Sequence, residues 1–134
     1  MLPLGVRSGP SGKQFPLGVR IGPSGKQYNY RRTDSFWQSF PVYQCDKAAD
    51  GWAVPPDTVL YLIRWGQGGW KAVHHGVNPR GVENGEPVFS TFENALASGW
   101  HKWFVNRAGA GQQPEWEIMA EVETVELWYQ VDSL

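Results

Sequence analysis

The feature that most constrains this chain is a tandem repeat at its beginning. Residues 3–15 read PLGVRSGPSGKQF and residues 16–28 read PLGVRIGPSGKQY, so the two copies are identical at eleven of thirteen positions. Each copy holds three glycines, two prolines and two cations but few apolar side chains. A unit this short cannot build a solenoid, and alone it buries too little surface to offset its ordering entropy. The repeat therefore predicts an extended arm.

Charge divides the chain at nearly the same place. Residues 1–33 carry six cations and no acid, whereas residues 34–134 carry six cations and all thirteen acids. A basic segment attached to an acidic body is typical of proteins that interact through that segment. We therefore expect an extended basic arm over residues 1–32 and a compact domain over residues 33–134.

The compact domain is expected to have an α+β fold, with a small, mostly antiparallel sheet. Strands are predicted where apolar residues alternate, and the glycine-rich residues 66–69 connect the first two clear strands as a hairpin. The alternation changes phase at Glu123 and Thr124, which predicts a bulge or tight turn there. The predicted strands are residues 58–65, 70–77 and 116–131, with an aromatic lead-in over residues 36–45.

One main helix is predicted over residues 91–107. Residues 90–93 (STFE) fit a capping box, in which the serine and the glutamate would satisfy the first free amides of a helix. Phe92, Leu96 and Trp103 then recur at helical spacing, which predicts an apolar stripe packed on the sheet.

No group of residues predicts catalysis, a cofactor or a metal site. His74 and His75 are neighbours on an expected strand and point to opposite faces, so they are poorly placed to share one ion, and His101 is distant in sequence. Cys45 is the only cysteine, which excludes an intrachain disulfide. Residues 22–26 (GPSGK) lack the preceding strand and following helix of a phosphate-binding loop. We therefore expect a non-enzymatic protein without a cofactor.

The duplication itself predicts a binding function. Two nearly identical peptides in tandem imply two nearly identical receptor grooves, which occur on symmetric oligomers. Linking two weak ligands makes the second binding event intramolecular and so raises avidity. We expect the arm to dock onto other subunits of a large symmetric assembly or onto copies of this chain. The predicted partner-binding residues are Leu4, Val6, Arg7, Phe15, Leu17, Val19, Arg20, Tyr28, Arg31 and Arg32.

In its layout, an arm of 32 residues ahead of a compact domain, the chain resembles small structural and accessory proteins of tailed-phage particles. Decoration, collar, tail and baseplate proteins of this kind strap neighbouring subunits together. The resemblance implies a structural protein of a virion. With one cysteine and no continuous apolar stretch near its N-terminus, the chain is expected to be made in a reducing cytoplasm without a signal peptide.

Two alternatives remain open. The cations interleaved with Phe15, Tyr28 and Tyr30 could follow a phosphate backbone while the rings stack on bases, so a protein that binds single-stranded nucleic acid is the first alternative. The acidic C-terminal third opposes it, because it would repel the same backbone. The second alternative is a small enzyme of unrecognised type. No apolar run is long enough to span a membrane, so we expect no membrane partner.

Overall fold

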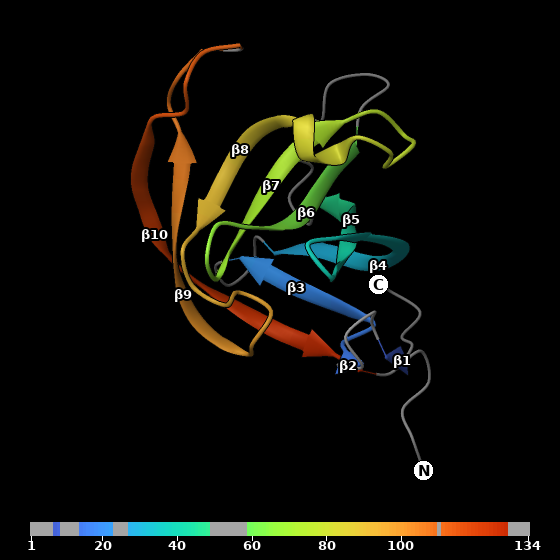
Figure 1. Cartoon of the computed structure of the whole chain (residues 1–134). Coiled ribbons are helices and arrows are strands. Elements are labelled where there is room, and N and C mark those ends of the chain that lie inside the picture. Colours follow the sequence, from blue (N-terminus) through green and yellow to red (C-terminus); the bar gives the residue numbers. More distant parts are fainter. Residues whose placement is uncertain (1–6, 9–13, 23–26, 49–58, 110, 129–134) are drawn as a thin grey trace.

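The chain forms a closed antiparallel β-barrel of eight strands (Figure 1). The computed structural model describes residues 7–8, 14–22, 27–48, 59–109 and 111–128. Around the barrel the strand order is β10-β3-β4-β5-β6-β7-β8-β9, and β9 pairs with β10 to close it. The described strands are β1 (Arg7–Ser8), β2 (Gln14–Phe15), β3 (Gly18–Gly22), β4 (Tyr28–Trp37), β5 (Phe40–Ala48), β6 (Val59–Trp65), β7 (Gly69–His75), β8 (Glu86–Thr91), β9 (Gly99–Asn106) and β10 (Trp116–Leu127).

Alternating side chains fill the barrel. Val19, Tyr43, Leu62 and Trp70 are fully buried and belong to one core cluster inside the barrel. Successive residues of a strand point to opposite faces, so every second residue of these strands faces this core. Trp103 from β9 and Val122 from β10 complete it from the opposite wall.

A second, smaller core covers the outer face of β5, β6 and β7. Tyr61 and Ile63 of β6 lie in this cluster and are fully buried, as are Val42 and Val73. The 3-10 helix η1 (Val82–Asn84) covers them through Val82. Both faces of β6 are therefore covered, as the apolar residues on both faces of the predicted strand 58–65 indicate. The predicted hairpin is also confirmed, because β6 and β7 pair across the turn at residues 66–68.

The predicted α+β fold with one main helix is wrong. Residues 99–106, in the middle of the expected helix, form strand β9 between β8 and β10. Gly99 has φ of +134°, which a right-handed helix cannot accommodate at its centre. The hydroxyl of Thr91 donates to the carbonyl of Lys102 at 2.7 Å and accepts from the amide of Glu93 at 3.3 Å. The supposed cap thus ties β8 to β9 instead of starting a helix.

The expected phase change of the last strand lies at a different place. β10 runs without interruption through Glu123 and Thr124, and its register against β9 shifts between Ile118 and Ala120. At Glu123 and Thr124 the strand is paired on both sides, with β9 and with β3. Residues 129–131 of the predicted strand lie outside the described residues.

The second copy of the repeat is placed in the wall of the barrel. Residues 18–22 form β3, and β4 begins at Tyr28, so the expected domain boundary at residue 33 falls inside β4. The first copy is placed differently, because Arg7 and Ser8 pair only with Phe15 and Gln14 in a small separate sheet. The only helix in the described part of the chain has three residues, so no helix there could cross a membrane.

Candidate functional site: the slot of the second repeat and an exposed aromatic surface

The slot of the second repeat is the gap in the barrel that β3 fills between β10 and β4. Residues 123–127 of β10 pair with residues 18–22 on one side, and residues 28–31 of β4 pair with residues 18–21 on the other. Val19 and Ile21 point inward and have 0% and 5% of their surface exposed. This slot holds a five-residue peptide by backbone pairing along both edges and by two buried side chains.

Three hydrogen bonds hold the residues that lead into β3. The hydroxyl of Tyr43 donates to the carbonyl of Pro16, and the backbone amide of Arg32 donates to the carbonyl of Leu17, both at 2.9 Å. The Arg32 guanidinium donates to the carbonyl of Phe15, also at 2.9 Å. Burial raises the pKa of Tyr43 well above its ordinary value, so this phenol stays protonated and remains a donor.

Phe15, the last residue of the first repeat, also contacts the barrel. The rings of Phe15 and Phe40 meet edge to face with their centroids 5.3 Å apart, and Phe40 packs in the same way on Trp70 at 5.6 Å. On the outer face of the sheet, the guanidinium of Arg20 donates to the side-chain oxygen of Asn29 at 3.0 Å. The second repeat is therefore fixed on its inner face and on its outer face, and the residue directly before it is fixed as well.

The structure brings several predicted partner-binding residues together, but within one chain. Phe15 and Val19 are buried in the barrel core, and Leu17, Tyr28 and Arg32 are partly buried beside it. Arg31 is exposed. Leu4 and Val6 lie outside the described residues, and of Arg7 only the strand position is described. The second repeat thus already occupies a groove, and that groove is on its own barrel.

An exposed aromatic surface lies on the outside of the barrel, at a place where the sequence analysis predicts no site. It consists of Trp65, Phe92, Phe104, Trp116 and Ile118. The Trp65 ring lies 5.5 Å from Phe92 and 6.0 Å from Trp116, and Phe92 lies 5.2 Å from Phe104. Phe92 is 55% exposed, and Ile118, which faces Phe104 across the ladder, is 58% exposed. The sequence predicts Phe92 in a buried helix stripe, and this error in secondary structure concealed the surface.

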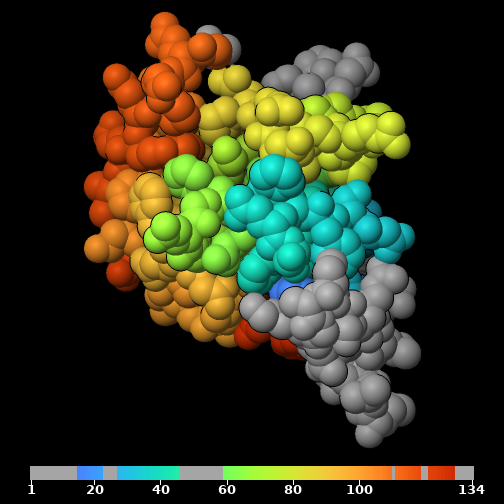
Figure 2. All heavy atoms as spheres, viewed as in Figure 1, coloured from blue at the N-terminus to red at the C-terminus, as the bar shows by residue number. Residues whose placement is uncertain are grey.

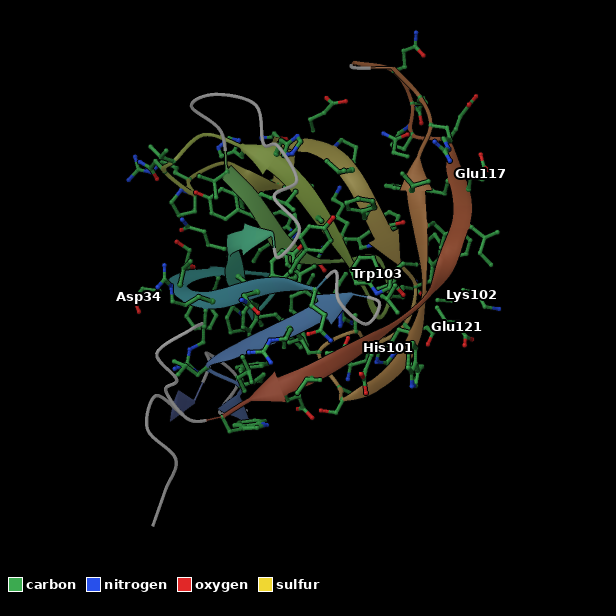
Figure 3. All side chains as sticks on the ribbon, turned by 180° about the vertical axis from the view of Figure 1, so that it is seen from behind. Asp34, His101, Lys102, Trp103, Glu117 and Glu121 are labelled. Atoms are coloured by element: carbon green, nitrogen blue, oxygen red, sulfur yellow. The ribbon has the colours of Figure 1, made fainter. Side chains whose placement is uncertain are left out.

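Charged residues border the aromatic surface. The Lys71 ammonium lies 5.3 Å from the centre of the Trp65 ring, within the range of a cation–π contact. Figure 3 shows Lys102 and Glu121 on the outer side of β9 and β10, whereas Trp103 lies on the inner side. Lys102 and Glu121 are partners in the register of these strands. The surface is therefore apolar at its centre and mixed in charge at its border.

The described residues contain no arrangement that suggests chemistry. Among them no group of three or more histidine, cysteine, aspartate or glutamate side chains could hold a metal ion. His75 lies 2.8 Å from the carbonyl of Arg80, and His101 lies 2.7 Å from the carbonyl of Ala97. Both imidazoles therefore bind the backbone of nearby loops. Apart from Gly22, residues 22–26 lie outside the described residues.

A hollow of about 500 Å³ lies beside the start of the second repeat. Phe15, Phe40, Leu96 and Trp128 supply apolar walls, and the Arg64 guanidinium lies 4.6 Å from the centre of the Phe40 ring. These residues form a shallow, mostly apolar depression at one end of the barrel.

Comparisons with protein-family models, with curated proteins and with solved structures found no match to this chain.

Proposed function

We propose that the chain is a non-enzymatic structural protein that joins a symmetric multi-subunit assembly. The observation that carries the proposal is the exposed aromatic surface on one side of the barrel. Single apolar residues are common on protein surfaces, but a contiguous cluster in which Phe92 and Ile118 are exposed and three further rings are half-buried marks a contact with another molecule. Aromatic side chains are also enriched in protein interfaces, because they bury much area with few rotatable bonds.

The proposed partner is another protein subunit. β9 and β10, which carry most of the aromatic surface, lie on the side of the barrel away from the β4–β5 hairpin (Figures 1 and 2). The rings are therefore presented as one face, which suits contact with a neighbour in a regular array. The border of Lys71, Lys102 and Glu121 supplies both signs of charge, as in the polar rim of a protein interface.

The first repeat is the second element of this proposal. Its residues 5–9 differ from those of β3 at a single position, and β3 already fills the slot of its own barrel. When one chain carries both a docking peptide and a docking surface, the second contact forms within an existing complex. The avidity of the chain for the assembly therefore rises. In its most specific form the proposal is a subunit of a virus particle, in agreement with the layout that resembles tailed-phage accessory proteins.

Binding of single-stranded nucleic acid is the second candidate function. It is supported by the Trp65 ring with Lys71 beside it, because a ring next to a cation can stack on a base and attract its phosphate. Glu121 is exposed near the same rings and would repel a phosphate backbone. The observations therefore favour a protein partner.

The test is the sedimentation of the tagged full-length chain expressed in its natural source. We expect the wild-type chain to sediment with a large particle and a Phe92→Ser/Ile118→Ser variant to remain in the light fractions. Loss of a central interface residue costs about 2 kcal/mol or more, which is a loss of about 30-fold in affinity. Val77→Ser is the matched control, because Val77 is 73% exposed but lies in the loop after β7, outside the aromatic surface.

Two results would contradict the proposal. One is a wild-type chain that sediments alone, or a double variant that enters the particle as well as Val77→Ser does. The other is a particle that dissociates when treated with nuclease, which would support nucleic-acid binding instead.

A further inference from the structure

Each chain carries two strand peptides but has one slot for them. Residues 5–9 of the first repeat read GVRSG and residues 18–22 of β3 read GVRIG. Val6 corresponds to the buried Val19, and Arg7 to the outward Arg20. In the segment that fills the slot, Ser8 in place of Ile21 is the only difference.

The slot recognises features that both repeats possess. Along its two edges it binds the backbone, which is the same for any sequence. The Tyr43 hydroxyl and the Arg32 amide bind the carbonyls of Pro16 and Leu17, and the first repeat has proline and leucine at the same places, as Pro3 and Leu4.

The end of the slot requires a glycine. Gly22 has φ of +151°, a conformation that side-chain-bearing residues rarely adopt. The first repeat supplies Gly9 at the corresponding position. The first repeat therefore satisfies the backbone requirements of the slot from its start to its end.

The single difference sets the order of preference. Ile21 is 5% exposed in the barrel core, and the first repeat would place the smaller, polar Ser8 there. Loss of one buried isoleucine side chain changes an equilibrium by about 100-fold. Within one chain the second repeat therefore fills the slot, and the first repeat is the weaker competitor.

Strand β1 of the first repeat is held by a short ladder, whereas Phe15, the last residue of that repeat, is buried in the barrel core. Strand β1 makes two register pairs, Arg7 with Phe15 and Ser8 with Gln14, in a sheet apart from the barrel. A two-stranded ladder of this length contributes little stability by itself. Leaving it for a slot with two pairing edges therefore costs little.

We propose that the slot between β10 and β4 also binds the first repeat of a second copy of this chain. This inference rests on the proposed function, because crowding of copies within an assembly is what lets a weaker strand compete. When the first repeat of one copy enters the slot of another, the second repeat of the host is released.

Disulfide trapping tests the proposal with full-length chains. Arg20 and Asn29 face each other across β3 and β4, so two cysteines at such a pair can form a disulfide. All variants also carry Cys45→Ala, which removes the native thiol. One chain then carries Arg7→Cys, the other carries Asn29→Cys, and the two are mixed at high concentration under mild oxidation.

We expect a covalent dimer joined between positions 7 and 29, identified by mass spectrometry of the linked peptides. Adding Ser8→Ile to the first chain removes the one unfavourable difference and should raise the dimer yield at limiting concentration by about tenfold or more. Gln67→Cys mixed with Asn29→Cys measures random collision, because Gln67 is exposed in the turn after β6. A single chain with Arg20→Cys and Asn29→Cys must form an internal disulfide, which verifies the geometry of the pair.

Three results would overturn the proposal. The first is a dimer yield no higher than the collision control, with or without Ser8→Ile. The second is a disulfide between positions 7 and 29 that forms only when both substitutions are on one chain, which would make the exchange internal. The third is failure of the Arg20→Cys/Asn29→Cys control. If the Phe92→Ser/Ile118→Ser variant still entered the particle while the disulfide between positions 7 and 29 formed between chains, the aromatic surface would be rejected as the docking site. Strand exchange would be retained.

Discussion

A pair of reciprocal substitutions separates the two copies of the repeat by their effect on stability. Ile21→Ser removes a side chain that is 5% exposed in the barrel core, whereas Ser8→Ile makes the opposite change thirteen residues earlier in β1. Loss of a buried isoleucine costs about 2–5 kcal/mol, and burying a hydroxyl without a partner adds about 1–3 kcal/mol. Because the site can relax in part, we expect Ile21→Ser to lower the free energy of unfolding by about 3–5 kcal/mol.

Ser8→Ile should change the free energy of unfolding by no more than about 0.5 kcal/mol, since β1 lies outside the barrel. Urea denaturation followed by tryptophan fluorescence measures both values, because the buried Trp70 and Trp103 report on the barrel core. Equal midpoints for wild type, Ile21→Ser and Ser8→Ile would refute the placement of the second repeat in the barrel. The expected loss for Ile21→Ser is a large share of the total stability of a small domain, about 5–15 kcal/mol.

Three further predictions concern the strands around the slot and the neighbouring loop. Tyr43→Phe removes the buried hydrogen bond to the Pro16 carbonyl and should lower the free energy of unfolding by about 1–3 kcal/mol in the same denaturation assay. Trp103→Ala should cost about 3–5 kcal/mol, because this side chain is 4% exposed inside the barrel; a loss below about 1 kcal/mol would place it outside the core. The backbone amide of Lys102 donates to the Glu93 carboxylate at 3.1 Å. This hydrogen bond is the largest cause that lowers the pKa of Glu93 from its ordinary value of 4.5. Because the pKa of Glu93 is lower in the folded state, the ionised carboxylate stabilises the fold above pH 4.5, and this stabilisation is lost as the pH falls through the lowered pKa. Wild type should therefore be more stable than Glu93→Gln at neutral pH, and acid titration should show this difference shrinking below about pH 4.5.

The central hairpin could be predicted from the sequence, because its information is local. Residues 58–65 and 70–77 alternate or are apolar throughout, and a glycine-rich turn joins them. β6 and β7 form as expected, with bounds displaced by one or two residues. Periodicity and turn chemistry were sufficient here, since the pairing partner follows directly in the chain.

The segment over residues 91–107 was misread because two periods fit it. Phe92, Leu96 and Trp103 match a helical stripe, but Trp103 and Phe104 also lie on opposite faces of a strand. The outcome depends on β8 and β10, which pair with β9 on either side. Such tertiary pairing overrides a local helical pattern.

The repeat was misread for a related reason. Considered alone, residues 16–28 have too few apolar side chains to fold. In the barrel, Val19 and Ile21 are sufficient, because both edges of β3 are paired, with β4 nearby and with β10 about a hundred residues later. Phe15, Arg20 and Arg32 contact their own chain in the structure, and their binding to a partner stays a prediction.

Hydrogen–deuterium exchange of the full-length chain tests the central claim most directly. The claim is that the second repeat is a strand of the barrel and that the first is a surplus copy of it. Peptic peptides from residues 3–15 and 16–28 differ in mass through Ser8 against Ile21 and Phe15 against Tyr28, so they can be followed separately. We predict that the β3 amides exchange about 100-fold or more slowly than those of residues 5–9, since β3 is paired on both edges. Equally rapid exchange in both peptides would contradict the account and return the whole repeat to an arm outside the barrel.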